Sequence, residues 1–177
     1  GTIRFDVAAA RDVKFAVEGA RVLVDQHGVV PGAPAEMALI TLMTNGQARM
    51  TRSHVRGEFP KVNPRFAGIS RSLSVHTAGE THDRPLPTGL AVQNWTTGRS
   101  DAFHFGADHI VEEMVVVPKP GASRESDAWL VGPSINLKAG VTELHAFDMA
   151  HVSDGPVATW QAEVALPAGF HGAWKGG

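Results

Sequence analysis

Short apolar or alternating runs, separated throughout by turn residues, are the feature that most constrains the fold of this chain. The 19 glycines and 11 prolines lie largely between these runs and leave little room for long helices. The pattern therefore predicts an all-β chain, with short helical pieces only around Val7–Arg11 or Asp108–Glu112. The predicted strands are Thr2–Val7, Arg21–Val24, Ala38–Thr44, Gln47–Val55, Leu90–Trp95, Ala102–Phe105, Met114–Val117, Ala128–Gly132, Glu143–Asp148 and Val157–Val164.

Three pairs of runs share one form, in which an apolar strand, a tight turn and an alternating strand follow one another. Their turns contain Gly46, Gly98 and Gly155, each preceded by Asn, Thr or Asp, which is the chemistry of β-hairpin turns. The glycines lie about 52 and 57 residues apart, close to the spacing of roughly 50 residues found for four-stranded propeller blades. A β-sandwich could show the same marks, but the spacing favours propeller blades.

Composition excludes several classes of protein. The net charge of -2 gives no electrostatic reason to expect nucleic acid or an anionic membrane as a partner. No apolar run is long enough for an integral membrane segment. The absence of cysteine excludes disulfides, thiolate catalysis and cysteine-bound zinc, and it fits a cytoplasmic protein. We therefore expect no nucleic-acid partner, no integral membrane segment and a cytoplasmic location.

The last dozen residues combine small residues with Phe170, His171 and Trp174. Chain ends are usually polar and frayed. An apolar end that carries an imidazole is therefore expected to dock inward and to bring His171 to a site. Gly169 and Gly172 would allow the backbone to approach that site closely.

The other histidines carry weaker signals. His76, His82, His104 and His109 are predicted at the surface or rim, because no two of them have the spacing of a metal-binding motif. Asp83 beside His82 could form an acid–base pair, but no nucleophile motif accompanies it. No glycine-rich phosphate loop is present either. The histidines without any signal are His27, His54, His145 and His151.

Four segments carry distinctive residue combinations in a fixed order. They begin with Glu58-Phe59-Pro60 within Arg56–Gly68, continue with Glu113–Leu130 and Thr142–Asp148, and end with Gly169–Trp174. Together these segments resemble the C-terminal portion of the carotenoid cleavage oxygenase family, which includes lignostilbene and isoeugenol oxygenases.

The resemblance covers most of residues 36–175, and residues 1–35 fit it loosely. Two positions depart from the family pattern. Met114 replaces the usual proline after the glutamate, and Leu73–His82 replaces a strand that is rich in aromatic residues.

The resemblance implies the C-terminal blades, about three, of a seven-bladed β-propeller, with residues 1–177 as a single partial domain. In the family one Fe(2+) on the propeller axis is bound by four histidines, and glutamates hydrogen-bond to three of them. His171 matches the fourth metal ligand, and Glu58 and Glu113 match two of these glutamates. The other three histidines would lie upstream, so the chain is expected to be a fragment that is inactive alone.

The implied activity is that of a non-haem iron(II)-dependent dioxygenase. It would cleave a C=C double bond of a carotenoid, apocarotenoid or stilbene-like substrate with O2 to give two carbonyl products. The implied partners are an apolar conjugated small molecule, O2 and the remainder of the propeller. The alternative is a non-catalytic β-propeller or lectin-like binding module, in which His171 only packs.

Overall fold

The computed structural model of the chain describes residues 1–12, 34–80, 86–169 and 171–175. Within these ranges the regular structure consists of β-strands and two 3-10 turns, Pro64–Phe66 (η1) and Val152–Asp154 (η2), without an α-helix. The prediction of an all-β fold class is confirmed. No helix in the described ranges could span a membrane.

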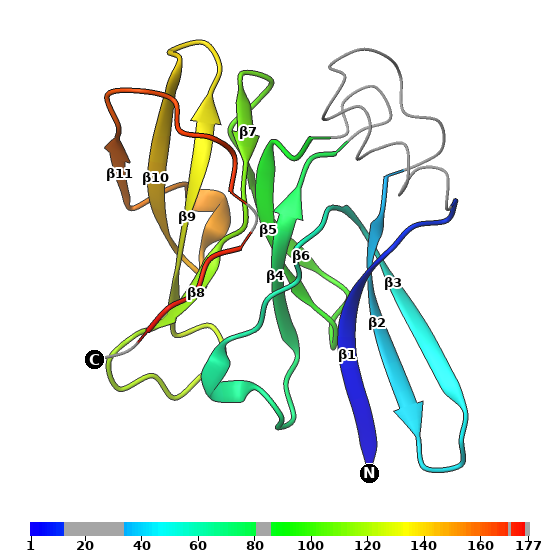
Figure 1. Cartoon of the computed structure of the whole chain (residues 1–177). Coiled ribbons are helices and arrows are strands. Elements are labelled where there is room, and N and C mark those ends of the chain that lie inside the picture. Colours follow the sequence, from blue (N-terminus) through cyan, green and yellow to red (C-terminus); the bar gives the residue numbers. More distant parts are fainter. Residues whose placement is uncertain (13–33, 81–85, 170, 176–177) are drawn as a thin grey trace.

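The described strands form three antiparallel sheets that follow one another along the chain (Figure 1). The first has the order β1-β2-β3, the second β4-β5-β6, and the third β11-β10-β9-β7, with β8 also paired to β9. The strands are Thr2–Ala9 (β1), Glu36–Met43 (β2), Ala48–Arg56 (β3), Leu73–Ala78 (β4), Gly89–Asn94 (β5), Ser100–His104 (β6), His109–Val111 (β7), Val115–Pro118 (β8), Ala128–Asn136 (β9), Val141–Asp148 (β10) and Ala158–Gln161 (β11).

The three predicted hairpins are confirmed. Gly46 between β2 and β3 has a φ of 81°, and Gly98 between β5 and β6 has a φ of 72°. A residue with a Cβ is strained at such angles, so these two turns require glycine. The third predicted turn, which ends at Gly155, joins β10 to β11 through η2.

The short helical pieces predicted around Val7–Arg11 and Asp108–Glu112 are wrong. The first region continues β1, which pairs with β2 along its whole length, and the second contains β7, which pairs with β9. In both places a neighbouring strand satisfies the backbone groups that a helix would have paired locally. The strand predicted at Arg21–Val24 lies outside the described residues, and β4 and β7 are missing from the predicted runs.

The hydrophobic core lies between the second and third sheets. Phe147 on β10 is fully buried, and its ring centroid lies 5.5 Å from that of Phe103 and 5.9 Å from that of Phe105. Burying such a ring contributes roughly 2–3 kcal/mol, so these contacts join the two sheets. The buried cluster comprises Val75, Leu90, Val92, Val111, Met114, Val116, Ala128, Leu130, Phe147, Met149 and Val152.

Directional polar contacts join the first sheet to the second. Asp6 on β1 accepts a hydrogen bond of 2.8 Å from Trp95 Nε1 and forms an ion pair with Arg71. Ser53 Oγ on β3 donates to Gln93 Oε1 on β5 at 2.6 Å. Because buried polar groups must find partners in a defined geometry, these contacts fix how the two sheets face each other.

Candidate metal centre

Glu113 lies in a short connection between β7 and β8 that is pressed against β9. The backbone N–H of Glu112 donates to the carbonyl oxygen of Pro133 at 3.1 Å. A Cβ on Gly132 would lie 2.6 Å from Met114 Sδ and 2.7 Å from the carbonyl oxygen of Glu113, so β9 needs a glycine there. This close approach fixes the backbone from which the side chains of Glu112 and Glu113 project.

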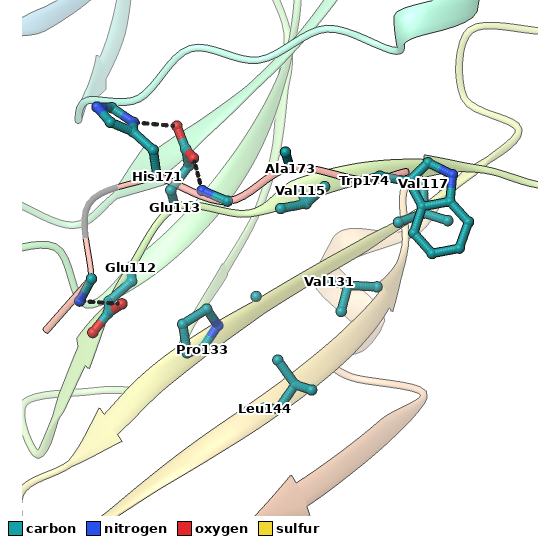
Figure 2. Close-up of a pocket in the computed structure, with 13 residues that line it drawn as sticks. Glu112, Glu113, Val115, Val117, Val131, Pro133, Leu144, His171, Ala173 and Trp174 are labelled. Carbon is teal, nitrogen blue, oxygen red and sulfur yellow. Dashed lines mark hydrogen bonds and ion pairs between the residues drawn. The ribbon is translucent and has the colours of Figure 1, made fainter. Parts of the chain in front are cut away.

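The carboxylate of Glu113 is 4% exposed and has three partners. Its Oε1 lies 3.3 Å from His171 Nδ1 and 3.0 Å from Lys61 Nζ. Its Oε2 accepts a hydrogen bond of 2.8 Å from the backbone N–H of Gly172. Figure 2 shows the contacts to the C-terminal segment from both oxygens. The partners offset the desolvation of a buried carboxylate.

These partners also decide the ionisation of Glu113. Burial alone would raise the pKa of Glu113, but the hydrogen bonds from Gly172, Lys61 and His171 and the positive charge of Lys61 together lower it below its usual value of 4.5. Glu113 is therefore ionised at neutral pH. An ionised carboxylate can only accept hydrogen bonds, so His171 carries a proton on Nδ1.

The His171 ring is oriented through one of its two nitrogens, Nδ1. With Nδ1 hydrogen-bonded to Glu113, Nε2 has no hydrogen-bond partner among the described residues. The ring of Phe59 meets the imidazole edge-on, with centroids 5.9 Å apart, and the His171 side chain is 74% exposed. An imidazole that donates one N–H to a carboxylate and leaves the other nitrogen free is the usual form of a metal-ligating histidine.

The C-terminal segment reaches Glu113 because β10 and β8 hold it along its course. The backbone N–H of Leu166 donates to Thr142 Oγ1 on β10 at 2.8 Å. A Cβ on Gly172 would lie 2.7 Å from Val115 Cγ2 on β8, so the segment passes β8 at a distance that favours glycine. Its backbone contacts place His171 against Glu113, but the predicted inward docking does not extend to the apolar side chains, since Leu166 and Trp174 are 52% and 55% exposed.

Glu58 has a fixed backbone and an unpaired carboxylate. Its N–H donates to Thr77 Oγ1 at 3.0 Å, and its carbonyl oxygen accepts from the N–H of Thr77 at 3.0 Å. The following residue, Phe59, has a φ of 57°, a strained angle for a non-glycine residue. The Glu58 carboxylate makes no hydrogen bond to His171 or to any other described residue. The described structure therefore brings Glu113 to His171 and leaves Glu58 apart.

Glu80 is an acidic residue near Glu58 that the sequence did not single out. It is 5% exposed. Burial, and then the charge of Glu58, raise the pKa of Glu80 to about 8. Partial desolvation also raises the pKa of Glu58, although the residue as a whole is exposed. Nothing in the local sequence around Glu80 marks it as buried, because its burial depends on how the second sheet packs.

An apolar cavity of about 350 Å³ lies between the C-terminal segment and β8 to β10. Figure 2 shows Trp174 above Val117 and Val131, with Leu144 on the neighbouring strand. The two glutamates Glu112 and Glu113 lie at the side of this cavity where His171 is held. The carboxylates of Glu112 and Glu113 therefore lie at the border of an apolar surface, where water competes less for their hydrogen bonds.

The prediction that His76 lies at the surface or rim is wrong. His76 is 1% exposed on β4, and its Nδ1 lies 2.7 Å from the carbonyl oxygen of Thr77. Its run contains serine and threonine, which hid the strand from the periodicity. His104 is exposed, as predicted, and His109 is half-buried.

His145, which carries no signal in the sequence, is also buried. Its ring nitrogens lie 2.9 Å from Ser134 Oγ and 2.9 Å from Thr159 Oγ1. Strand alternation on β10 places it on the core face beside Phe147. His54 and His151 are exposed, and His27 and His82 lie outside the described residues.

Within the described ranges, no group of three or more histidine, aspartate or glutamate side chains could hold a metal ion. His171 with Glu113 offers one oriented imidazole and nothing more. A single imidazole could fill only one position of a metal site.

The family-model comparison covers most of the chain. The model described as Retinal pigment epithelial membrane protein (RPE65) matches residues 13–176. Lignostilbene-alpha,beta-dioxygenase isozyme III of Sphingomonas paucimobilis is 26% identical over 130 residues, which are 66% of this chain and 26% of that protein. A carotenoid cleavage oxygenase of Mycobacterium tuberculosis is 28% identical over 160 residues, 85% of this chain and 31% of that protein.

Solved structures share the fold. Cobalt-substituted Synechocystis apocarotenoid oxygenase superposes with a TM-score of 0.85 at 19% identity, over 99% of this chain and 37% of that one. Pseudomonas brassicacearum lignostilbene dioxygenase gives a TM-score of 0.72 at 21% identity, over 81% of this chain and 33% of that one.

The chain spans between a quarter and a third of the length of these two curated relatives. Its three described sheets are blades of a β-propeller, as predicted, and they correspond to part of each neighbouring structure. With a family model matched over residues 13–176, the chain belongs to the RPE65/carotenoid oxygenase family.

Proposed function

We propose that the protein containing this chain is a non-haem iron(II)-dependent dioxygenase. It would cleave a C=C double bond of a carotenoid, apocarotenoid or stilbene-like substrate with O2 and release two carbonyl products. The observation that carries the proposal is the 3.3 Å contact between His171 Nδ1 and Glu113, which leaves Nε2 free. The names of the lignostilbene and carotenoid oxygenases among the relatives support the substrate class, and the cobalt-substituted neighbour supports a metal.

His171 would supply one of four imidazoles to the metal. Bound Fe(2+) would supply the activation of O2. Glu113 would hold the His171 ring in one tautomer and one orientation, and Lys61 would keep that carboxylate ionised. The contribution of this chain is thus to position a ligand rather than to transfer protons to the substrate.

Glu58 would accept a hydrogen bond from a metal-binding histidine outside this chain. Its carboxylate lacks a partner among the described residues, while its backbone is fixed to Thr77. A strained backbone angle at Phe59 directly after it indicates that the surroundings, and not local preference, set its position.

The remainder of the propeller would cover the free face of the first sheet. On this face Ile3, Phe5, Leu42 and Met50 are 67%, 42%, 38% and 48% exposed, and Ile3 lies directly opposite Leu42. Such a contiguous apolar face favours a protein partner. Residues 1–177 would then be one partial domain that holds no iron by itself, and the cytoplasmic location stays a prediction.

Replacement of His171 by alanine tests the proposal. In the complete protein, His171→Ala should lose iron and substrate turnover together, because one of four ligands is removed. The matched controls are His104→Ala and His151→Ala, since both histidines are exposed and neither has a described contact with His171 or Glu113. Metal analysis of the purified variants, with turnover measured alongside, gives the readout.

Two results would contradict the proposal. If His171→Ala keeps its full iron content while His104→Ala loses iron, the metal lies elsewhere. If the complete wild-type protein binds no iron, a non-catalytic binding module becomes the better interpretation.

A further inference from the structure

Two consecutive glutamates hold the C-terminal segment at two backbone amides. Glu113 Oε2 accepts from the N–H of Gly172 at 2.8 Å, and Glu112 Oε2 accepts from the N–H of Gly169 at 3.0 Å. Figure 2 shows the two carboxylates at separate points of the segment, one on each side of the His171 backbone. The family resemblance assigns a role to Glu113 only.

The two hydrogen bonds enclose His171 between fixed points. The imidazole is 74% exposed, so packing restrains it weakly, and the edge-on ring of Phe59 is its aromatic neighbour. The position of Nε2 therefore depends on how the backbone is held at Gly169 and Gly172. With only the Glu113 contacts, the backbone before His171 could swing away from β8 while the ring kept its hydrogen bond.

Glu112 is well placed to supply the second fixed point. Its own N–H donates to the carbonyl oxygen of Pro133 on β9, so its side chain projects from a rigid backbone. Burial raises the pKa of Glu112, and the hydrogen bond from Gly169 lowers it, with burial the stronger effect. A half-buried carboxylate without a nearby cation is costly unless it serves as an acceptor.

We propose that Glu112 is a positioning residue for His171, acting as the hydrogen-bond acceptor for the Gly169 amide. The inference rests on the proposed function, because it takes His171 to be a metal ligand. It adds to that function a second carboxylate, one that contacts the backbone before the ligand rather than the ligand itself.

Two substitutions of Glu112 separate the effect of its hydrogen-bond acceptor from the effect of its negative charge. Glu112→Gln keeps an oxygen that can accept from Gly169, whereas Glu112→Ala removes the acceptor. Glu112→Asp, whose carboxylate is one methylene shorter, is a second loss variant should the alanine variant fold poorly. Glu163→Ala is the matched control. Glu163 is an exposed glutamate without a described partner, and it lies on the C-terminal stretch that Glu112 contacts.

Two measurements on the complete protein apply to every variant. Hydrogen–deuterium exchange of residues 165–175 in the metal-free protein reports whether the segment is held. Titration of the metal-free protein with cobalt(II) alone reports how well the ligand is placed. In Glu112→Ala and Glu112→Asp, loss of this hydrogen bond should accelerate exchange of the segment and raise the Kd for cobalt by about 5-fold. In Glu112→Gln, the exchange rate and the cobalt Kd should both stay within about 2-fold of the wild-type values.

The inference is overturned if Glu112→Ala matches Glu163→Ala in both measurements, or if Glu112→Gln is as impaired as Glu112→Ala. His171→Ala, run in the same titration, separates this inference from the proposed function. If His171→Ala binds cobalt like wild type, the proposed function fails, and the metal role of Glu112 fails with it. The exchange of the metal-free protein still decides whether Glu112 holds the segment.

Discussion

Glu113 and Glu58 match the same kind of family position, yet their surroundings give them opposite electrostatic properties. Glu113 is buried beside His171, Lys61 and the Gly172 amide, and its pKa is lowered. The Glu58 carboxylate has no hydrogen-bond partner among the described residues, and its pKa is raised. The motif therefore identifies the carboxylates, but the partners around each one determine its charge state.

The neighbours of the two glutamates widen the difference. Lys61 contributes a cation to the Glu113 carboxylate, whereas Glu80 contributes a second acid beside Glu58. One region is ready to orient a ligand within the described structure. The other carries two acids that repel each other when both are ionised.

The largest stability effect is expected for Glu80→Gln. The folded-state pKa of Glu80, about 8, lies above its ordinary value of 4.5, so the folded protein binds the proton more tightly than the unfolded chain. Stability should therefore fall as the pH rises from about 4.5 to about 8, by up to about 1.4 kcal/mol per pH unit. Urea unfolding should show Glu80→Gln to be more stable than wild type at pH 7, by on the order of 3 kcal/mol. A gain of equal size at pH 4 would refute this explanation.

The next prediction compares Glu113→Gln with Glu58→Gln. Each should weaken iron or cobalt binding by about 10–100-fold, the usual scale for residues that orient a metal ligand. Their effects on the free energy of unfolding should differ in sign. Glu113→Gln places an amide NH2 against a donor and destabilises the metal-free protein, whereas Glu58→Gln, measured above about pH 8 where both acids are ionised, relieves the repulsion with Glu80. Equal stability changes in the two variants would remove the contrast between the two regions.

The smallest effect is expected for Lys61→Met. Lys61 is 35% exposed, so loss of its ion pair with Glu113 should cost about 0.5–1 kcal/mol of stability. The loss should shrink at high salt, and cobalt affinity should change by less than about 3-fold because Gly172 and His171 still contact the carboxylate. Lys119→Met is the control, since Lys119 pairs with Asp148 away from His171 and should leave cobalt affinity unchanged. A large loss of cobalt affinity in Lys61→Met would make Lys61 a main determinant of the site.

Several features could be predicted from the sequence because they depend on local patterns. Alternation over a few residues identified most strands, and hairpin turn chemistry located the turns at Gly46 and Gly98. The apolar C-terminal segment predicted inward docking; His171 does contact Glu113, but Leu166 and Trp174 remain exposed. Each of these features can be recognised from residues that are close in sequence, or from motifs that occur in a fixed order.

The remaining features depend on contacts between distant residues. The serine and threonine in β4 hide a buried strand, and only its packing against the neighbouring sheets buries His76. Burial likewise raises the pKa of Glu80. Glu112 meets Gly169 across 57 positions of sequence.

The sequence by itself thus determined the all-β class and the hairpins, and it marked His171, Glu58 and Glu113 as candidates without saying which carboxylate meets the imidazole. Only the tertiary structure decided which carboxylates are ionised, which lack partners among the described residues, and which backbone amides of the C-terminal segment are held. The physical reason is that strand and turn preferences act over a few residues. Desolvation and hydrogen bonding depend on whatever atoms the folded chain brings within a few ångströms.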